Sequence, residues 1–324
     1  MSVRLFDYIF WNRYATRVAP AEFYFDIYCE FRSLTLDLDQ DGDAILEVIP
    51  KMESRSLMLA GLPPLTEAEL EVAKDAVRTW SAKGYALLLP SSPLWPRTKL
   101  RGLTDPPRGL FVLGAAQLLE TPLLAVVGSR EVSRPSLEWL ETELGEFLRR
   151  EVDVNLLSGG ARGVDQCAHR TALRKGRPTV VFLPSGFDQI YPRELERWRE
   201  DILRSGGCFV SEYAPGATMR KPYFGERNRL ISAFSDGVLI VEARRRSGTL
   251  LTAKAAADQS RAVFVVPGAP YDSQFAGSLD LINEGATMVR DAQELSVFFH
   301  VEIRNSYHAL KSSSTDRGVI SVDH

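Results

Sequence analysis

Six short apolar runs, separated by segments long enough for a helix, are spaced along residues 122–299. They lie at residues 123–127, 154–157, 179–183, 208–210, 238–241 and 262–266. The runs are continuously apolar and do not alternate with polar residues, which is typical of strands buried on both faces. This pattern predicts an α/β domain with a parallel sheet that helices cover on both sides. Right-handed crossovers then bring the loops after the strands to one edge, where open α/β folds bind ligands.

The chain before this domain has another pattern. Residues 1–84 are rich in aromatic side chains at helical spacing and predict a small helical domain. Thr66 followed by Glu69 is the pattern of a capping box, and it predicts a helix that closes at Gly84.

Two further segments flank the predicted sheet domain. Five prolines interrupt residues 85–121, which we expect to form an extended but packed connecting arm rather than a regular helix or central strand. Residues 300–324 hold little apolar material and predict a polar, mostly disordered tail.

The composition excludes several classes of protein. The 324 residues carry 39 Lys and Arg against 42 Asp and Glu, a formal net charge of -3, which argues against a uniformly cationic coat but not against a local basic patch. No segment approaches the roughly 20 apolar residues of a membrane span, and the first residues lack a signal-peptide pattern. Three distant cysteines predict neither a disulfide framework nor a metal site. We therefore expect a cytoplasmic protein.

Two glycine-containing loops suit a phosphate group. The first is Gly128-Ser129-Arg130, and the second runs Ser158-Gly159-Gly160-Ala161-Arg162-Gly163. Amides at a strand-to-helix turn and an arginine are ordinary phosphate ligands, and glycine lets the backbone approach closely. Neither loop has a dinucleotide fingerprint or a Walker lysine, so we expect no nucleotide cofactor. The alternative is a tight turn that only packs a helix on the sheet.

Cationic and aromatic residues interleave in the next two loops. The third loop ends in Tyr191-Pro192-Arg193, and the fourth leads into Phe224, Arg227, Asn228 and Arg229. Stacking on bases while contacting phosphates requires this combination. Residues 122–299 contain 20 Arg but only 3 Lys. Arginine favours bidentate phosphate contacts and stacking, so the bias indicates a site for a polyanion.

Catalytic patterns are weaker. The fifth loop carries Arg244-Arg245-Arg246, which is either part of the functional edge or only a run of solvated surface charges. Asp165 and His169 at helical spacing favour a capping or packing pair over a Ser-His-Asp arrangement. Glu212 and Glu242 follow two strands, where hydrogen bonding to the loops is favoured over an acid–base pair. We expect no catalytic residue.

Several short motifs follow one another along the predicted sheet domain. They are Gly128-Ser129-Arg130, the second glycine loop with Val164-Asp165, Tyr191-Pro192, Arg227-Asn228-Arg229, Val241-Glu242-Ala243 and Pro267-Gly268. With these motifs, residues 85–298 resemble the DNA-processing protein A (DprA, or Smf) family of bacteria. The resemblance implies an extended Rossmann-like domain that binds single-stranded DNA without a cofactor. It also implies a homodimer that protects incoming DNA during natural transformation and helps load the bacterial recombinase.

Carried over position by position, the DNA pocket of that family falls on the residues of the four loops. They are Gly128, Ser129, Arg130, Ser158, Gly159, Gly160, Arg162, Gly163, Arg193, Phe224, Arg227, Asn228 and Arg229. The leading hypothesis is a non-enzymatic DNA-binding protein. The alternative is a nucleotide N-glycosidase or phosphoribohydrolase on a related scaffold, using Glu242 with the Ser247-Gly248-Thr249 turn, although the glycine-rich run of such enzymes is missing.

Overall fold

A computed structural model describes residues 7–8, 11–12, 66–90 and 92–301. Most of the expected helical domain, Cys29 and nearly all of the expected tail lie outside these residues. The last helix of that domain is described: α5 (Glu67–Ala82) begins after the cap Thr66, and the predicted capping box with Glu69 is present. Gly84 follows the helix with a φ of +74°.

The described residues form a single nine-stranded sheet in the order β1-β2-β6-β5-β4-β3-β7-β8-β9. The strands are β1 (Tyr85–Leu88), β2 (Leu110–Gly114), β3 (Leu123–Gly128), β4 (Asn155–Ser158), β5 (Thr179–Phe182), β6 (Cys208–Ser211), β7 (Gly237–Val241), β8 (Ala262–Val266) and β9 (Thr287–Met288). Strands β3 to β9 pair in parallel, whereas β2 pairs antiparallel with both β1 and β6. All six predicted runs are strands, and the α/β fold is confirmed.

Residues 85–121 are not an arm beside the sheet, because they supply its strands β1 and β2. The five prolines lie between these strands rather than within them, at positions 90, 93, 96, 106 and 107. A proline at such a position ends a strand without removing a hydrogen bond from the ladder. The prolines therefore lie outside both strands, and the expectation that this segment holds no central strand was wrong at β2, which pairs with strands on both sides.

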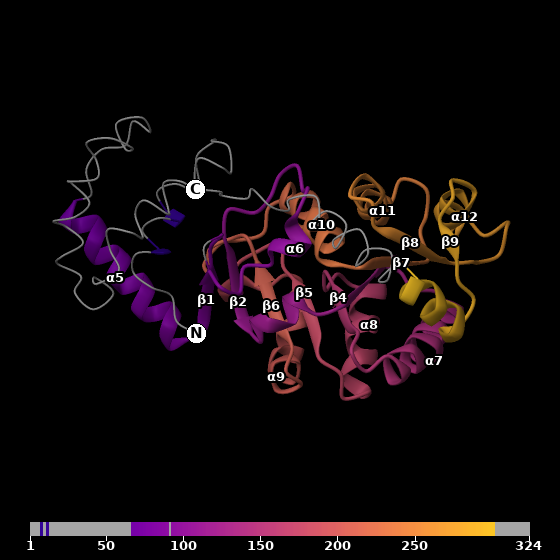
Figure 1. Cartoon of the computed structure of the whole chain (residues 1–324), viewed down its shortest axis with the longest axis horizontal. Coiled ribbons are helices and arrows are strands. Elements are labelled where there is room, and N and C mark those ends of the chain that lie inside the picture. Colours follow the sequence, from indigo (N-terminus) through magenta and orange to yellow (C-terminus); the bar gives the residue numbers. More distant parts are fainter. Residues whose placement is uncertain (1–6, 9–10, 13–65, 91, 302–324) are drawn as a thin grey trace, which may run out of the picture.

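Helices cover both faces of the sheet (Figure 1). The helix α7 (Arg134–Arg150) and α8 (Val164–Arg174) pack on one face, and α10 (Tyr223–Phe234) and α11 (Gly248–Asp258) pack on the other. The shorter elements are α6 (Arg97–Leu100), η2 (Ala116–Glu120), η3 (Phe187–Gln189), η4 (Arg193–Trp198), α9 (Arg199–Arg204) and α12 (Ala276–Asn283).

The side chains of β3 divide between two apolar cores. Leu124 and Val126 pack with α7 and α8, whereas Ala125 and Val127 pack with α10 and α11. All four are buried. A strand with apolar partners on both faces has no polar position, because successive side chains point to opposite sides. This is the physical reason for the continuous apolar runs.

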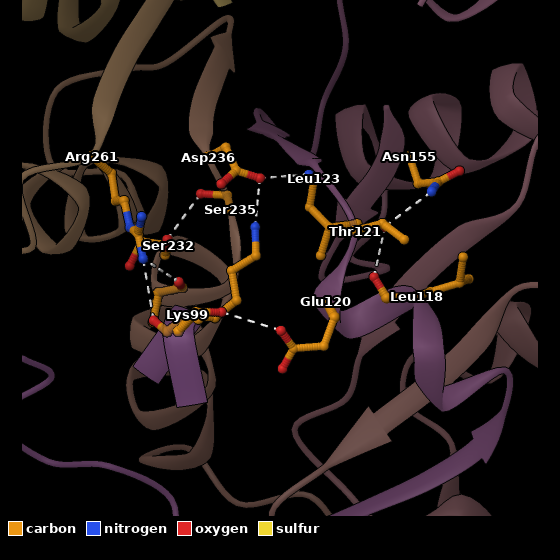
Figure 2. A network of polar contacts seen from close by, with 12 residues as sticks. Lys99, Leu118, Glu120, Thr121, Leu123, Asn155, Ser232, Ser235, Asp236 and Arg261 are labelled. Atoms are coloured by element: carbon orange, nitrogen blue, oxygen red, sulfur yellow. Dashed lines mark hydrogen bonds and ion pairs between the residues drawn. The ribbon is translucent and has the colours of Figure 1, made fainter. Parts of the chain in front are cut away.

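A largely buried ion pair holds α6 against the amino-terminal end of the parallel strands (Figure 2). Lys99 Nζ lies 2.5 Å from Asp236 Oδ2, which also accepts a hydrogen bond from the Leu123 amide at 2.8 Å. Burial lowers the pKa of Lys99, and the Asp236 carboxylate opposes this effect. Arg261 Nη2 donates to the Lys99 carbonyl at 3.2 Å. The network therefore fixes α6 to the starts of β3 and β7.

The strand order reverses between β3 and β7. From β3 the chain adds β4, β5 and β6 on one side, and β7, β8 and β9 then lie on the other. The connections after β3 and β7 consequently leave in opposite directions, which opens a crevice at the carboxyl ends of these two strands. At that end Gly128 pairs with Val241.

Candidate functional site

A cavity of about 500 Å³ lies at the carboxyl ends of β3 and β7, where the strand order reverses. We call it the switch cavity. Of the predicted site residues, the following line it: Gly128, Ser129, Arg130, Phe224, Arg227 and Asn228. Its volume lies in the range of small-molecule and cofactor sites, roughly 300–1,000 Å³. The parallel sheet thus brings the first and fourth predicted loops into one site.

Arg130 and Phe224 form a cationic and aromatic pair at this cavity. The Arg130 guanidinium carbon lies 5.4 Å from the centre of the Phe224 ring, within reach of a cation–π interaction. The Tyr191 ring meets Phe224 edge-on at 5.8 Å between centroids. Arg130 is exposed and has no carboxylate partner in the described chain. Its positive charge is therefore available to a bound anion.

The glycines of the second loop accommodate protein atoms rather than an open anion site. A Cβ at Gly159 would lie 1.9 Å from Arg227 Nη1, and one at Gly160 would lie 2.4 Å from Leu195 Cδ1. Gly163 has a φ of +85°, and its Cβ would lie 2.2 Å from the Ser129 carbonyl oxygen. The Ser129 carbonyl also accepts a hydrogen bond from the Val164 amide at 3.0 Å. These glycines are needed for close packing of the loops.

Arg227 is buried beneath the cavity. Its Nη1 donates to the carbonyl oxygens of Gly159 at 2.5 Å and Phe182 at 2.8 Å, which links α10 to the ends of β4 and β5. Burial lowers the pKa of Arg227 to about 10, and the Asp165 carboxylate opposes that effect. The Nε atom is buried without a hydrogen-bond partner in the described chain. Arg227 thus positions the loops from below.

The helix that follows the second loop contains two buried titratable groups. Burial raises the pKa of Asp165 to about 6, against the opposing charge of Arg227 and the Ala161 amide. Burial lowers the pKa of His169 to about 3, and its Nδ1 lies 2.7 Å from Thr179 Oγ1. Ser158 Oγ is buried and donates to the Val126 carbonyl at 2.5 Å. These two contacts join β4 to β3 and α8 to β5.

Two predicted arginines are neutralised by carboxylates. Arg162 forms an ion pair with Glu194. Arg229 forms a bidentate pair with Glu212, at 2.9 and 3.0 Å, and a further contact with Asp105 at 3.1 Å. Neither arginine lines the switch cavity. Their charges are matched by protein groups, unlike that of Arg130.

Arg193 lines a second cavity. This cavity, of about 690 Å³, lies beside the third loop and also includes Asp188, Tyr191 and Thr218. Tyr191 therefore lines the second cavity and also contacts Phe224, which lines the switch cavity. The five predicted arginines do not converge in one pocket.

The fifth loop contributes residues that the four-loop prediction omitted. Arg244, Ser247, Gly248 and Thr249 line the switch cavity, as does the exposed Leu251 in the first turns of α11. The sequence does not reveal that β7 pairs with β3, and this pairing is what places the fifth loop beside the first. Of the neighbouring arginines, Arg245 instead pairs with Asp280. The sequence pattern that could have pointed to this loop is the Ser247-Gly248-Thr249 turn at the start of a helix.

The two candidate acid–base carboxylates serve other contacts. Glu242 is fully buried with a φ of +58°, and its Oε2 accepts a hydrogen bond from the Ser133 amide at 2.9 Å. Ser133 is the N-cap of α7, so Glu242 occupies that helix terminus. Glu212 is paired with Arg229, although burial raises its pKa. The described residues contain no cluster of metal-ligating side chains, and none of the described helices is long and apolar enough to cross a bilayer.

Comparison with known proteins assigns the chain to a family. The family model for DNA recombination-mediator protein A matches residues 86–300. This chain belongs to that family. It is 36% identical over 200 residues to the DNA processing protein DprA of Streptococcus pneumoniae, a match that spans 62% of this chain and 70% of that protein. It is 37% identical over 216 residues to the protein Smf of Escherichia coli, covering 67% of this chain but only 57% of the relative.

Solved structures agree with this assignment. The structure of DNA processing protein A from S. pneumoniae matches with a TM-score of 0.67 and 28% identity, over 90% of this chain and 97% of that one. The protein from Helicobacter pylori, whose structure is described for its single-stranded DNA binding mode, matches with a TM-score of 0.58 and 30% identity. That match covers 68% of this chain and 96% of the other. The expected family and Rossmann-like fold are both confirmed.

Proposed function

We propose that this family member binds single-stranded DNA at the carboxyl edge of the sheet, with the switch cavity holding a phosphate. Arg130 carries the proposal, because it pairs with the Phe224 ring at 5.4 Å and has no carboxylate partner in the described chain. An unneutralised arginine next to an aromatic ring suits phosphate contact together with base stacking. The single-stranded DNA binding mode described for the H. pylori relative supports the same ligand.

The wider role follows from the family. A mediator of recombination acts on a DNA strand together with a recombinase, so we propose that a bacterial recombinase is the partner. We also propose that the protein is a cytoplasmic homodimer that protects incoming DNA during natural transformation. Pull-down of a purified recombinase by this chain, with and without an oligonucleotide, tests the partnership, and light scattering tests the dimer.

The proposed role needs no chemical step. Glu242, on which the glycosidase alternative depends, is fully buried and bonded to the cap of α7. Incubation with nucleoside monophosphates tests the alternative directly. Release of base or ribose by the wild type, and its loss in Glu242→Gln, would favour an enzyme.

The central experiment compares affinity for single-stranded and duplex DNA across salt concentrations. We expect tighter binding of single strands, with an affinity that falls as salt rises because phosphate contacts release counterions. Arg130→Ala should lower the affinity and reduce the slope of log Kd against log salt by about 1. Arg162→Ala, which removes an exposed arginine already paired with Glu194, is the matched control. Equal binding by both variants would contradict the assigned pocket.

A further inference from the structure

Among the helices that begin near the switch cavity, α7 and α11 differ at their amino-terminal ends. The end of α7 is occupied, because the Ser133 amide donates to Glu242 and the Ser133 hydroxyl accepts from the Ser136 amide at 3.4 Å. In open α/β folds the helix after the first parallel strand is the usual anion site. Here the chain fills that place with its own carboxylate.

The end of α11 is open by comparison. Its N-cap Ser247 makes no side-chain capping bond, and Ser247 Oγ is buried without a partner in the described chain. Within the described chain the amides of Gly248 and Thr249 have no acceptor, and the first turn holds no acidic residue. A Cβ at Gly248 would meet no atom within 4 Å. Donors and the positive helix terminus thus face unfilled space at the cavity wall.

Cationic side chains from three other elements line the same cavity. Arg130 has no carboxylate partner among the described residues, and Arg244 pairs only with the exposed Glu131 at 3.1 Å, a contact that a stronger anion can replace. Beneath them lies Arg227, which is 5% exposed and has a buried Nε without a partner. Nη1 of the same guanidinium donates to two backbone carbonyls, so only Nε is left as a buried donor without an acceptor in the described chain. This donor in the cavity wall is an observation independent of the helix terminus, and it too favours an anionic ligand.

We propose that the amino-terminal end of α11, with Arg130 and Arg244, is a subsite for a phosphate monoester carried by a nucleoside. A terminal phosphate bears close to two negative charges and three acceptor oxygens, whereas a phosphate within a strand bears one charge and two free oxygens. The amide donors around Gly248 and the two arginines match a terminal phosphate better than a phosphate within a strand. For a DNA end as ligand the inference rests on the proposed function; a free nucleoside monophosphate offers the same group.

The test uses calorimetry with thymidine oligonucleotides of one length, phosphorylated at one end in either polarity or bearing hydroxyls at both ends. Thymidine monophosphate is measured alongside them. We expect one phosphorylated polarity to bind about tenfold more tightly than the hydroxyl form, as a helix terminus and a charge-assisted hydrogen bond imply.

The decisive variant is Gly248→Glu. A carboxylate in the first turn favours the helix and fits the open space, so the fold should persist while phosphate is repelled. We expect the preference for the phosphorylated end to disappear. Ala257→Glu adds the same charge at an exposed position near the far end of α11 and should keep the preference. If Gly248→Glu fails to fold, Ser247→Ala removes a hydroxyl that has no partner to lose, and it should weaken the preference several-fold.

Each outcome bears on one of the two proposals. Equal affinity for all oligonucleotides in the wild type overturns the phosphate subsite and leaves single-strand binding standing. Binding of thymidine monophosphate that depends on Gly248, with no binding of any oligonucleotide, keeps the subsite and overturns the proposed function. If neither class of ligand binds, both are overturned.

Discussion

Arg227 Nη1 lies 2.5 Å from the Gly159 carbonyl oxygen, and a Cβ added at Gly159 would lie 1.9 Å from the same nitrogen. The hydrogen bond therefore requires glycine at position 159, because a side chain there would occupy the place of the guanidinium. Because Nη1 also donates to the Phe182 carbonyl, the guanidinium cannot retreat without breaking two bonds beneath the cavity. The second glycine loop is shaped by this buried arginine.

We expect Gly159→Ala to destabilise the fold by about 1–3 kcal/mol, the usual cost of overpacking a filled site. Urea unfolding measures the loss. Gly216→Ala is the control, since its added methyl meets no atom within 4 Å and its φ lies outside the positive region. Equal free energies of unfolding for the two variants would contradict the account of this contact.

Phe224→Leu should weaken binding of single-stranded DNA by about 1–3 kcal/mol, the cost of losing one base–aromatic stack. Fluorescence anisotropy with a thymidine oligonucleotide measures this change. Tyr271→Leu removes an aromatic ring that is 94% exposed and lines neither cavity, so it should leave affinity unchanged. A similar loss in both variants would point to a nonspecific effect of surface aromatics.

Arg229→Ala should act on stability rather than on the salt dependence of DNA binding. The change leaves the Glu212 carboxylate, whose side chain is 16% exposed, without its bidentate partner; such a loss costs about 3–5 kcal/mol in a fully buried pair and less at this exposure. The slope of log Kd against log salt should match that of the wild type at a temperature where both are folded. If the slope fell as much as it does in Arg130→Ala, Arg229 would be a phosphate contact and this interpretation would be wrong.

The buried Asp165 predicts an unusual pH dependence. Its pKa is raised from 3.8 to about 6 by burial, so its contribution to stability is fully present below pH 3.8 and is lost as pH rises through 6. His169 acts in the opposite direction, because its pKa falls from 6.5 to about 3 on folding and acid therefore favours the unfolded chain. Between pH 4 and 6 the two effects offset each other.

Asp165→Asn removes the titration of Asp165 and leaves that of His169. Its free energy of unfolding should fall on acidification more steeply than that of the wild type, by about 1.4 kcal/mol per pH unit. Urea unfolding at several values between pH 4 and 6 gives both slopes. Parallel slopes would show that Asp165 does not take up a proton on folding in this range.

Local patterns in the sequence were sufficient for the strands and for one helix start. The apolar runs are strands because both faces of the sheet are covered, and Thr66 with Glu69 forms the expected cap. Strands β1 and β2 were missed because their partners lie far away in the chain: Phe111 pairs with Ser211 and with Leu87. A four- or five-residue run beside prolines carries too little local signal to reveal such pairing.

For the site, the sequence by itself determined which residue types stand at the carboxyl edge of the sheet, because parallel strands place their following loops there. It did not determine which charges remain free. Arg130 and Arg229 both follow family motifs, yet only the tertiary structure places two carboxylates against Arg229 and an aromatic ring against Arg130. It also brings the start of α11 beside β3, since the order of strands is decided by packing between distant segments and not by any local pattern.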